Sequence, residues 1–195
     1  MSVGVDKSDN RSYEQARDIL EARDRGDLMQ LASDEASYPE MLYFLSGDTN
    51  SEIRCRVAAN PSTPIHADKV LSTDTEPLVR EALGAKVARR LPAHCGEDDV
   101  EHSNAIAILE HLIEDEEVRV RRIIAEELKL TDKAPLHIIQ KLACDIEECV
   151  STPILHHSPV LNDEKLIAII KDAATPSQLK AIAERALVSE PLSEC

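Results

Sequence analysis

Residue types that bind zinc gather in one stretch near the middle of the chain. His94 and Cys95 are adjacent, His102 follows them, and Asp98 and Asp99 lie between. Structural zinc sites use spacings such as paired Cys-x-x-Cys or His-x-x-x-His, which this stretch lacks. We therefore interpret it as a solvated polar loop, with zinc binding by these side chains as the alternative. We expect no metal and no cofactor in this protein.

Nucleophilic and acid–base side chains are present without a recognisable catalytic set. Five cysteines form no Cys-x-x-Cys pair, and an odd number suits reduced thiols rather than a disulfide framework. His156 and His157 precede Ser158 at an expected turn, where a histidine usually caps a helix or packs. Nucleophilic catalysis there would need a third orienting group, which the sequence does not place. We expect a protein without enzymatic activity.

Arginine recurs after acidic turns. A guanidinium presents a planar fork of donors that matches a carboxylate, so a repeated arginine can link neighbouring helix pairs. We predict a structural ladder in which each arginine binds a carboxylate or a helix-end carbonyl of its own or the preceding repeat. Its members are Arg54, Arg80 and Arg119, following Asp48, Asp74 and Asp115.

A second set of arginines offers a functional alternative. Together they carry enough positive charge to line a groove that receives an acidic peptide or a phosphate. These partner-binding candidates are Arg56, Arg89, Arg90, Arg121 and Arg122.

Three of the four aromatic residues, Tyr38, Tyr43 and Phe44, lie near the start of the first repeat. We predict that they fill the end of the core, where a terminal helix pair lacks a neighbour. The alternative is an exposed anchor for a partner or a second copy, because aromatic side chains are enriched in binding hot spots.

The elements that position these residues are expected to be helices. Hydrophobic residues make up 43% of the 195 residues, and apolar residues recur at helical spacing, as at Val120, Ile123, Ile124 and Leu128. Thr175, followed by a proline and then a glutamine at the third helical position, predicts a capping box. With only five glycines and no alternating strand pattern, the chain is predicted to be all-α.

Similar segments recur along the chain, with the three ladder arginines 26 and 39 residues apart. Irregular periods of about 20 to 50 residues are typical of helical solenoids, whose helix pairs bury their apolar faces by stacking. We predict one HEAT-like α-solenoid domain over residues 12–190, a right-handed superhelix of antiparallel helix pairs. Residues 1–11 are predicted to be a flexible lead-in and residues 191–195 a tail.

Charge and hydropathy bear on partners and location. The formal net charge is −15, which disfavours nucleic acid and anionic membrane surfaces. The N-terminus lacks an apolar signal region, and nowhere do about 18 apolar residues run together. We therefore expect a cytoplasmic protein that does not enter membranes and whose partner is another protein.

Two stretches carry a family resemblance. Residues 53–80, with Asn-Pro-Ser-Thr-Pro at 60–64 between two expected helices, resemble the leucine-rich repeat variant, a relative of HEAT repeats. Residues 152–166 and 178–185 resemble the bacterial domain of unknown function 2336 family. The resemblance implies a helical-repeat fold and a bacterial, cytoplasmic setting, and it implies no activity.

These features favour a non-enzymatic protein-interaction module with a regulatory or scaffolding role. One alternative is an enzyme like the HEAT-like DNA glycosylases, which would need a basic concave face and aromatic stacking. The other is a HEAT-like lyase or a chaperone for a cofactor-bearing protein, which would need a pocket.

Overall fold

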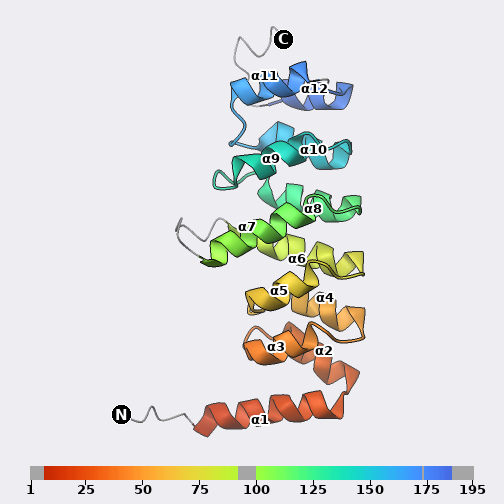
Figure 1. Cartoon of the computed structure of the whole chain (residues 1–195), viewed down its shortest axis with the longest axis vertical. Coiled ribbons are helices and arrows are strands. Elements are labelled where there is room, and N and C mark those ends of the chain that lie inside the picture. The colour runs from red at the N-terminus through yellow and green to blue at the C-terminus, as the bar shows by residue number, and fades with distance from the viewer. Residues whose placement is uncertain (1–6, 92–99, 173, 186–195) are drawn as a thin grey trace, which may run out of the picture. The chain divides into compact units, whose positions relative to one another are not determined.

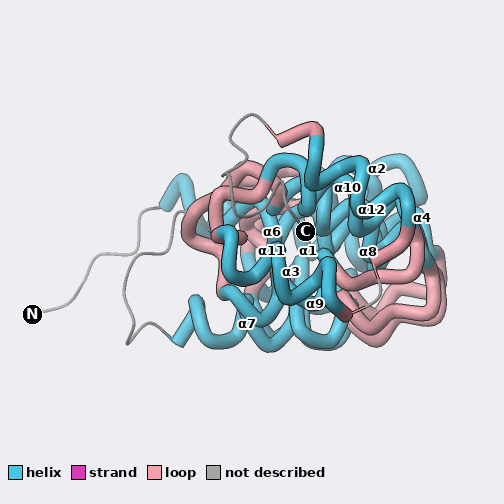
Figure 2. The backbone as a smooth tube through the Cα atoms, turned by 90° about the horizontal axis from the view of Figure 1, so that it is seen from above, coloured by secondary structure: helices cyan, strands magenta, loops and turns pink. Residues whose placement is uncertain are grey.

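The computed structural model describes residues 7–91, 100–172 and 174–185. Within those ranges the backbone forms helices and loops and no strand, which confirms the all-α prediction (Figure 2). The helices are α1 (Lys7–Ala22), α2 (Arg25–Ser33), α3 (Pro39–Leu45), α4 (Ser51–Ala59), α5 (Ile65–Leu71), α6 (Pro77–Arg90), α7 (Val100–Leu112), α8 (Val118–Leu128), α9 (Leu136–Ala143), α10 (Glu148–His157), α11 (Asp163–Lys171) and α12 (Pro176–Ala183).

The chain forms two compact units, residues 1–86 and 87–195, with the boundary inside α6. The sequence predicts one domain over residues 12–190, and the tail predicted at 191–195 lies outside the described residues. Residues 7–11 belong to α1 instead of a flexible lead-in. Once a helix is nucleated, each further residue adds a backbone hydrogen bond, so a polar stretch without Pro or Gly can extend it towards its N-terminus.

Short polar side chains start several helices. The carboxylate of Asp24 accepts from the backbone N–H groups of Gly26 and Asp27 at the start of α2. Asn50 caps α4 and Asn162 caps α11 in the same way. The predicted capping box at Thr175 is confirmed for α12. These caps satisfy backbone donors that have no partner within the helix, and they fix where each helix begins.

The first unit has two layers of helices, and α1 packs against α2 at one end of them (Figure 1). Helix α2 packs against α4 in one layer, and α3 packs against α5 in the other (Figure 1). Aliphatic side chains from both layers fill the space between them and are fully buried, among them Leu42, Leu45, Ile53 and Leu71. This packing holds the outward-facing residues of each layer on a rigid base.

In the second unit, α10 packs against α8 and α12, and α9 packs against both α8 and α10. The core is again aliphatic and includes Ile124, Leu128, Ile138 and Leu166. Among the described residues, no helix combines the length and the apolar character needed to span a membrane.

Candidate functional site

Arg54 links two consecutive acidic turns of the first unit. Its Nη1 donates to the backbone carbonyl of Asp48 at 2.8 Å, while Nε and Nη2 donate to Asp74 at 2.6 and 2.9 Å. The carbonyl thus comes from the turn before the arginine and the carboxylate from the turn after it. The sequence predicts that each arginine binds only a group of its own or the preceding repeat, so the contact with the following turn differs from the prediction. Because Nη1 is held by its own turn, the other edge of the guanidinium faces the next turn.

The electrostatics follow from this geometry. Burial alone would raise the pKa of Asp74, but hydrogen bonds from Arg54 and from the Glu76 backbone N–H bring it below its ordinary value. The hydrogen bond with Asp74 raises the pKa of Arg54, against the opposing effect of burial. The two groups therefore hold each other in their charged forms.

The second unit contains the same arrangement, centred on Arg121. Its Nε and Nη2 donate to Asp145 at 2.7 and 3.2 Å, and its Nη1 donates to the carbonyl of Asp115 at 2.5 Å. Arg119, predicted for this position, is exposed and lies 3.5 Å from Glu117. The ladder position after Asp115 therefore belongs to Arg121.

Spacing explains the shift of two residues. Arg54, Arg80 and Arg121 each lie six residues after the aspartate whose backbone carbonyl they bind. For Arg80, Nη1 donates to the backbone carbonyl of Asp74 at 2.6 Å. The prediction aligned helices by their apolar residues, which placed Arg119 four residues after Asp115. The aspartate-to-arginine spacing was the signal that finds the correct residue.

The partner-binding candidates do not form one group. Arg56 belongs to the first unit, and the other four belong to the second. Arg121 is held in the ladder, and Arg89 binds Glu127, whose hydrogen bond raises the pKa of Arg89. Arg90 is half-buried and Arg122 is exposed.

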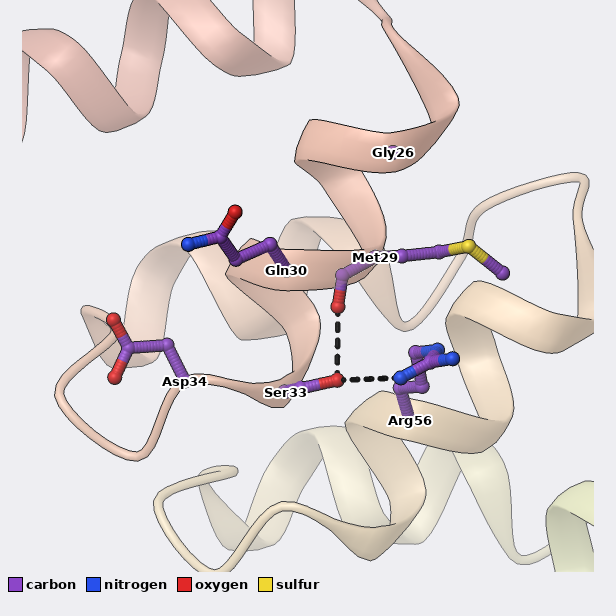
Figure 3. Close-up of a pocket in the computed structure, with 6 residues that line it drawn as sticks. All are labelled: Gly26, Met29, Gln30, Ser33, Asp34 and Arg56. Atoms are coloured by element: carbon purple, nitrogen blue, oxygen red, sulfur yellow. Dashed lines mark hydrogen bonds between the residues drawn. The ribbon is translucent and has the colours of Figure 1, made fainter.

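Arg56 lies at an open pocket of about 430 Å³ between α2 and α4 (Figure 3). Five residues of α2 and its C-terminal end complete the lining. They are Gly26, Met29, Gln30, Ser33 and Asp34. The pocket therefore combines one guanidinium with an amide, a hydroxyl, a thioether and the carboxylate of Asp34.

Hydrogen bonds orient the guanidinium of Arg56. Its Nη1 donates to Ser33 Oγ at 3.0 Å, and Ser33 Oγ donates to the carbonyl of Met29 at 2.9 Å (Figure 3). Its Nη2 lies 3.9 Å from Glu52, beyond hydrogen-bond distance, and 44% of the side chain is exposed. The group is thus held in position with part of its fork open to solvent.

The aromatic residues separate. Tyr38 makes an edge contact with Tyr13 of α1, with ring centroids 5.1 Å apart. Tyr43 and Phe44 are 48% and 56% exposed on α3, so the prediction that they fill the end of the core is wrong for these two. The neighbouring positions Met41, Leu42 and Leu45 supply the buried face of α3, which turns Tyr43 and Phe44 outward.

The other chemically capable residues are dispersed. His94 and Cys95 lie outside the described residues, and His102 is half-buried with a buried Nδ1 that has no hydrogen-bond partner. No cluster of three or more metal-ligating side chains occurs within the described ranges. The rings of His156 and His157 contact each other at a tilt of 53°, with their Nδ1 atoms 3.2 Å apart. Burial, followed by the charge of His156, lowers the pKa of His157.

A buried ion pair joins two residues that the sequence does not single out, Asp68 of α5 and Lys86 of α6. Lys86 Nζ lies 2.6 Å from Asp68 Oδ1, with the two side chains only 5% and 4% exposed. Lys86 also donates to the carbonyl of Asn60 at 3.3 Å. The available signal was charge on an apolar face, because Asp68 is adjacent to Ala67 and Lys86 lies one turn after Leu83.

A second series of polar links runs through positions 34, 60 and 86. Asn60 Nδ2 donates to the carbonyls of Ala32 and Asp34, both at 2.9 Å. Lys86 then donates to the carbonyl of Asn60. Asn60 and Lys86 therefore each bind the backbone of the residue 26 positions earlier, at the same interval that separates Arg54 from Arg80.

No family model, curated protein or solved structure matches this chain.

Proposed function

We propose that this chain is a non-enzymatic protein-interaction module built of HEAT-like helix pairs, in which Arg56 binds an acidic side chain of a partner protein. The observation that carries the proposal is the Arg56 pocket. Ser33 fixes the guanidinium, while 44% of the side chain stays exposed. A group that is oriented before binding loses less conformational freedom when its ligand arrives.

The repeated links support the architectural part of the proposal. The Arg54 contacts recur at Arg121, and the links to residues 34 and 60 recur at a 26-residue interval. Repeats of this kind are typical of an α-solenoid with a right-handed superhelix, in which adjacent helix pairs present a continuous layer to partners. Such a module acts by binding, as a scaffold or a regulator.

The surroundings of the pocket favour a carboxylate over a phosphate. A guanidinium fork pairs with either anion. Asp34 lines the pocket, Glu52 lies near Arg56, and the chain carries a net charge of −15. A dianionic phosphate is repelled more strongly by these charges than a single carboxylate is, and nucleic acid more strongly still.

A reducing bacterial cytoplasm fits the sulfur chemistry of the chain. Cys55, Cys144 and Cys149 are free thiols. Burial raises the pKa of Cys55 and of Cys144, which keeps them protonated and weakly nucleophilic.

Site-specific photo-crosslinking of the full chain in bacterial cells tests the proposal. With p-benzoylphenylalanine in place of the exposed Gln30, we expect a crosslinked protein, and mass spectrometry should find Asp or Glu within a few residues of the crosslink. Arg56→Glu should abolish the adduct, because it puts a second carboxylate where the ligand carboxylate sits. Arg17→Glu, an equal charge change at an exposed arginine of α1, is the matched control.

Three results would overturn the assignment. These are an adduct that persists in Arg56→Glu, an adduct lost equally in Arg17→Glu, and a crosslink to nucleic acid or to no macromolecule. Circular dichroism of each variant shows whether the adduct is lost because the chain unfolds. If Arg56→Glu unfolds, Arg56→Gln, which removes the charge without reversing it, should abolish the adduct in a chain that remains folded.

A further inference from the structure

A second surface of the first unit displays apolar side chains on α3 and α5. Tyr43 and Phe44, half of the four aromatic residues of the chain, are 48% and 56% exposed there. The ring of Tyr43 lies against His66 of α5, with centroids 4.7 Å apart. Val70, one helical turn after His66, is 50% exposed. We call these four residues the α3–α5 patch.

The patch stands on a rigid base. Met41, Leu42 and Leu45 anchor α3 in the core, and Ala67 and Leu71 anchor α5. Aromatic side chains have few rotatable bonds, so presenting them on packed helices leaves little conformational entropy to lose on binding. An exposed aromatic held in this way is the kind of residue that forms a binding hot spot.

Two exposed side chains of opposite charge lie beside the patch residues on α3 and α5. Glu40 precedes Tyr43 and Phe44 by about one turn of α3, and Lys69 lies between His66 and Val70 on α5. Both are exposed, and they carry opposite charges in a chain whose net charge is −15. These two charges complement a ligand whose apolar face carries one basic and one acidic residue at its edges.

The size of the patch selects among occupants. A whole aromatic side chain has about 150–250 Å² of surface, so the exposed parts of Tyr43 and Phe44 present roughly 100 Å² each. A stable dimer buries about 800 Å² on each partner, several times what the patch offers. An amphipathic helix instead docks through a few apolar anchors at i, i+3 or i+4, and i+7.

We propose that the α3–α5 patch is a second interaction surface, which binds a short amphipathic helix of a partner protein. The patch lies on the layer formed by α3 and α5, whereas the Arg56 pocket lies on the layer formed by α2 and α4. The two surfaces share no residue, so one unit can hold two ligands at once. The inference stands whether or not Arg56 binds a carboxylate.

The probe is a phage-displayed library of helical peptides with leucine at i, i+3, i+4 and i+7 and all other positions randomised, selected on the full chain. We expect selected peptides whose dissociation constant rises at least tenfold in Phe44→Ala, because truncation removes a hot-spot contact. Ile146→Ala, which truncates the almost fully exposed Ile146 of the other unit, should change the constant less than twofold. Arg56→Glu should also leave it unchanged.

The proposal is overturned if the library yields no binder or if Phe44→Ala and Ile146→Ala bind the selected peptide equally well. It is also overturned if sedimentation shows a dimer that Phe44→Ala dissociates, since the patch would then be an interface between copies. Because Phe44 is exposed, its truncation should leave the circular dichroism unchanged, and Val70→Ser provides a second variant that weakens peptide binding from the other helix.

Discussion

Removing Lys86 should destabilise the first unit far more than removing any surface lysine. Lys86→Ala leaves the carboxylate of Asp68, 4% exposed, without the ammonium that lies 2.6 Å from it, and it takes a donor from the Asn60 carbonyl. Breaking a buried ion pair from one side costs about 3–5 kcal/mol. That loss is a large part of the roughly 5–15 kcal/mol that holds a typical domain folded.

Urea unfolding followed by far-ultraviolet circular dichroism measures the loss, because the chain has no tryptophan to report by fluorescence. With a urea dependence of about 2 kcal/mol/M, the midpoint of the first unit should fall by about 1.5–2.5 M. The matched control is Lys69→Ala, which removes an exposed lysine next to Asp68 and should change stability by less than about 0.5 kcal/mol.

A double variant separates the ion pair from side-chain volume. Asp68→Leu with Lys86→Met replaces both charges by apolar groups of similar size, and such replacements are often neutral or stabilising. The double variant should therefore recover most of the stability lost in Lys86→Ala. The reasoning is refuted if Lys86→Ala is as mild as Lys69→Ala, or if the double variant is no more stable than Lys86→Ala.

Three further predictions concern the ladder and the histidine pair. Arg121→Ala should lower the free energy of unfolding by about 1.5–3 kcal/mol, since it removes charged hydrogen bonds. Arg119→Ala should lower it by about 0.5 kcal/mol or less, because Arg119 is exposed. Equal losses of stability in thermal melts of the two variants would contradict the assignment of Arg121 to the ladder. Because the pKa of Asp74 is lowered in the folded protein, its carboxylate stabilises the fold fully above the ordinary carboxyl pKa, and this stabilisation is lost as the pH falls through the pKa of the folded state. The melting temperature of Asp74→Asn should therefore depend less on acid pH than that of the unchanged protein. The lowered pKa of His157 likewise gives stability that is present above the ordinary histidine pKa and lost on acidification. His157→Gln should therefore reduce the change in melting temperature between neutral and mildly acidic pH. An unchanged pH dependence of the melting temperature would argue against this prediction.

The helices could be predicted from the sequence because their signals are local. Apolar spacing and capping residues such as Thr175 act within a few positions, so reading them requires no knowledge of the fold. The extension of α1 to Lys7 was missed because propagation along a polar stretch leaves no periodic pattern.

The site was harder to predict because it depends on pairs of residues far apart in the chain. Arg56 was named among the candidates, but its pocket forms only because Gly26 and Ser33 of α2 face it from more than 20 positions away. The buried pair of Asp68 and Lys86 depends equally on contact between residues of different helices. Such contacts can be tested only against the packed structure, whereas periodicity reports one helix at a time.

The interval of 26 residues in the first unit means that one segment of that length carries a donor and an acceptor for each series of links. Residues 49–74 hold Arg54 and its acceptor Asp74, together with Asn60, whose side chain donates to the carbonyl of Asp34 and whose own carbonyl accepts from Lys86. A tandem copy of this segment would bring a new donor and a new acceptor in the correct order, and the links at both junctions could form again without any compensating substitution. The chain therefore carries, in its own spacing, a means of growing longer by gene duplication.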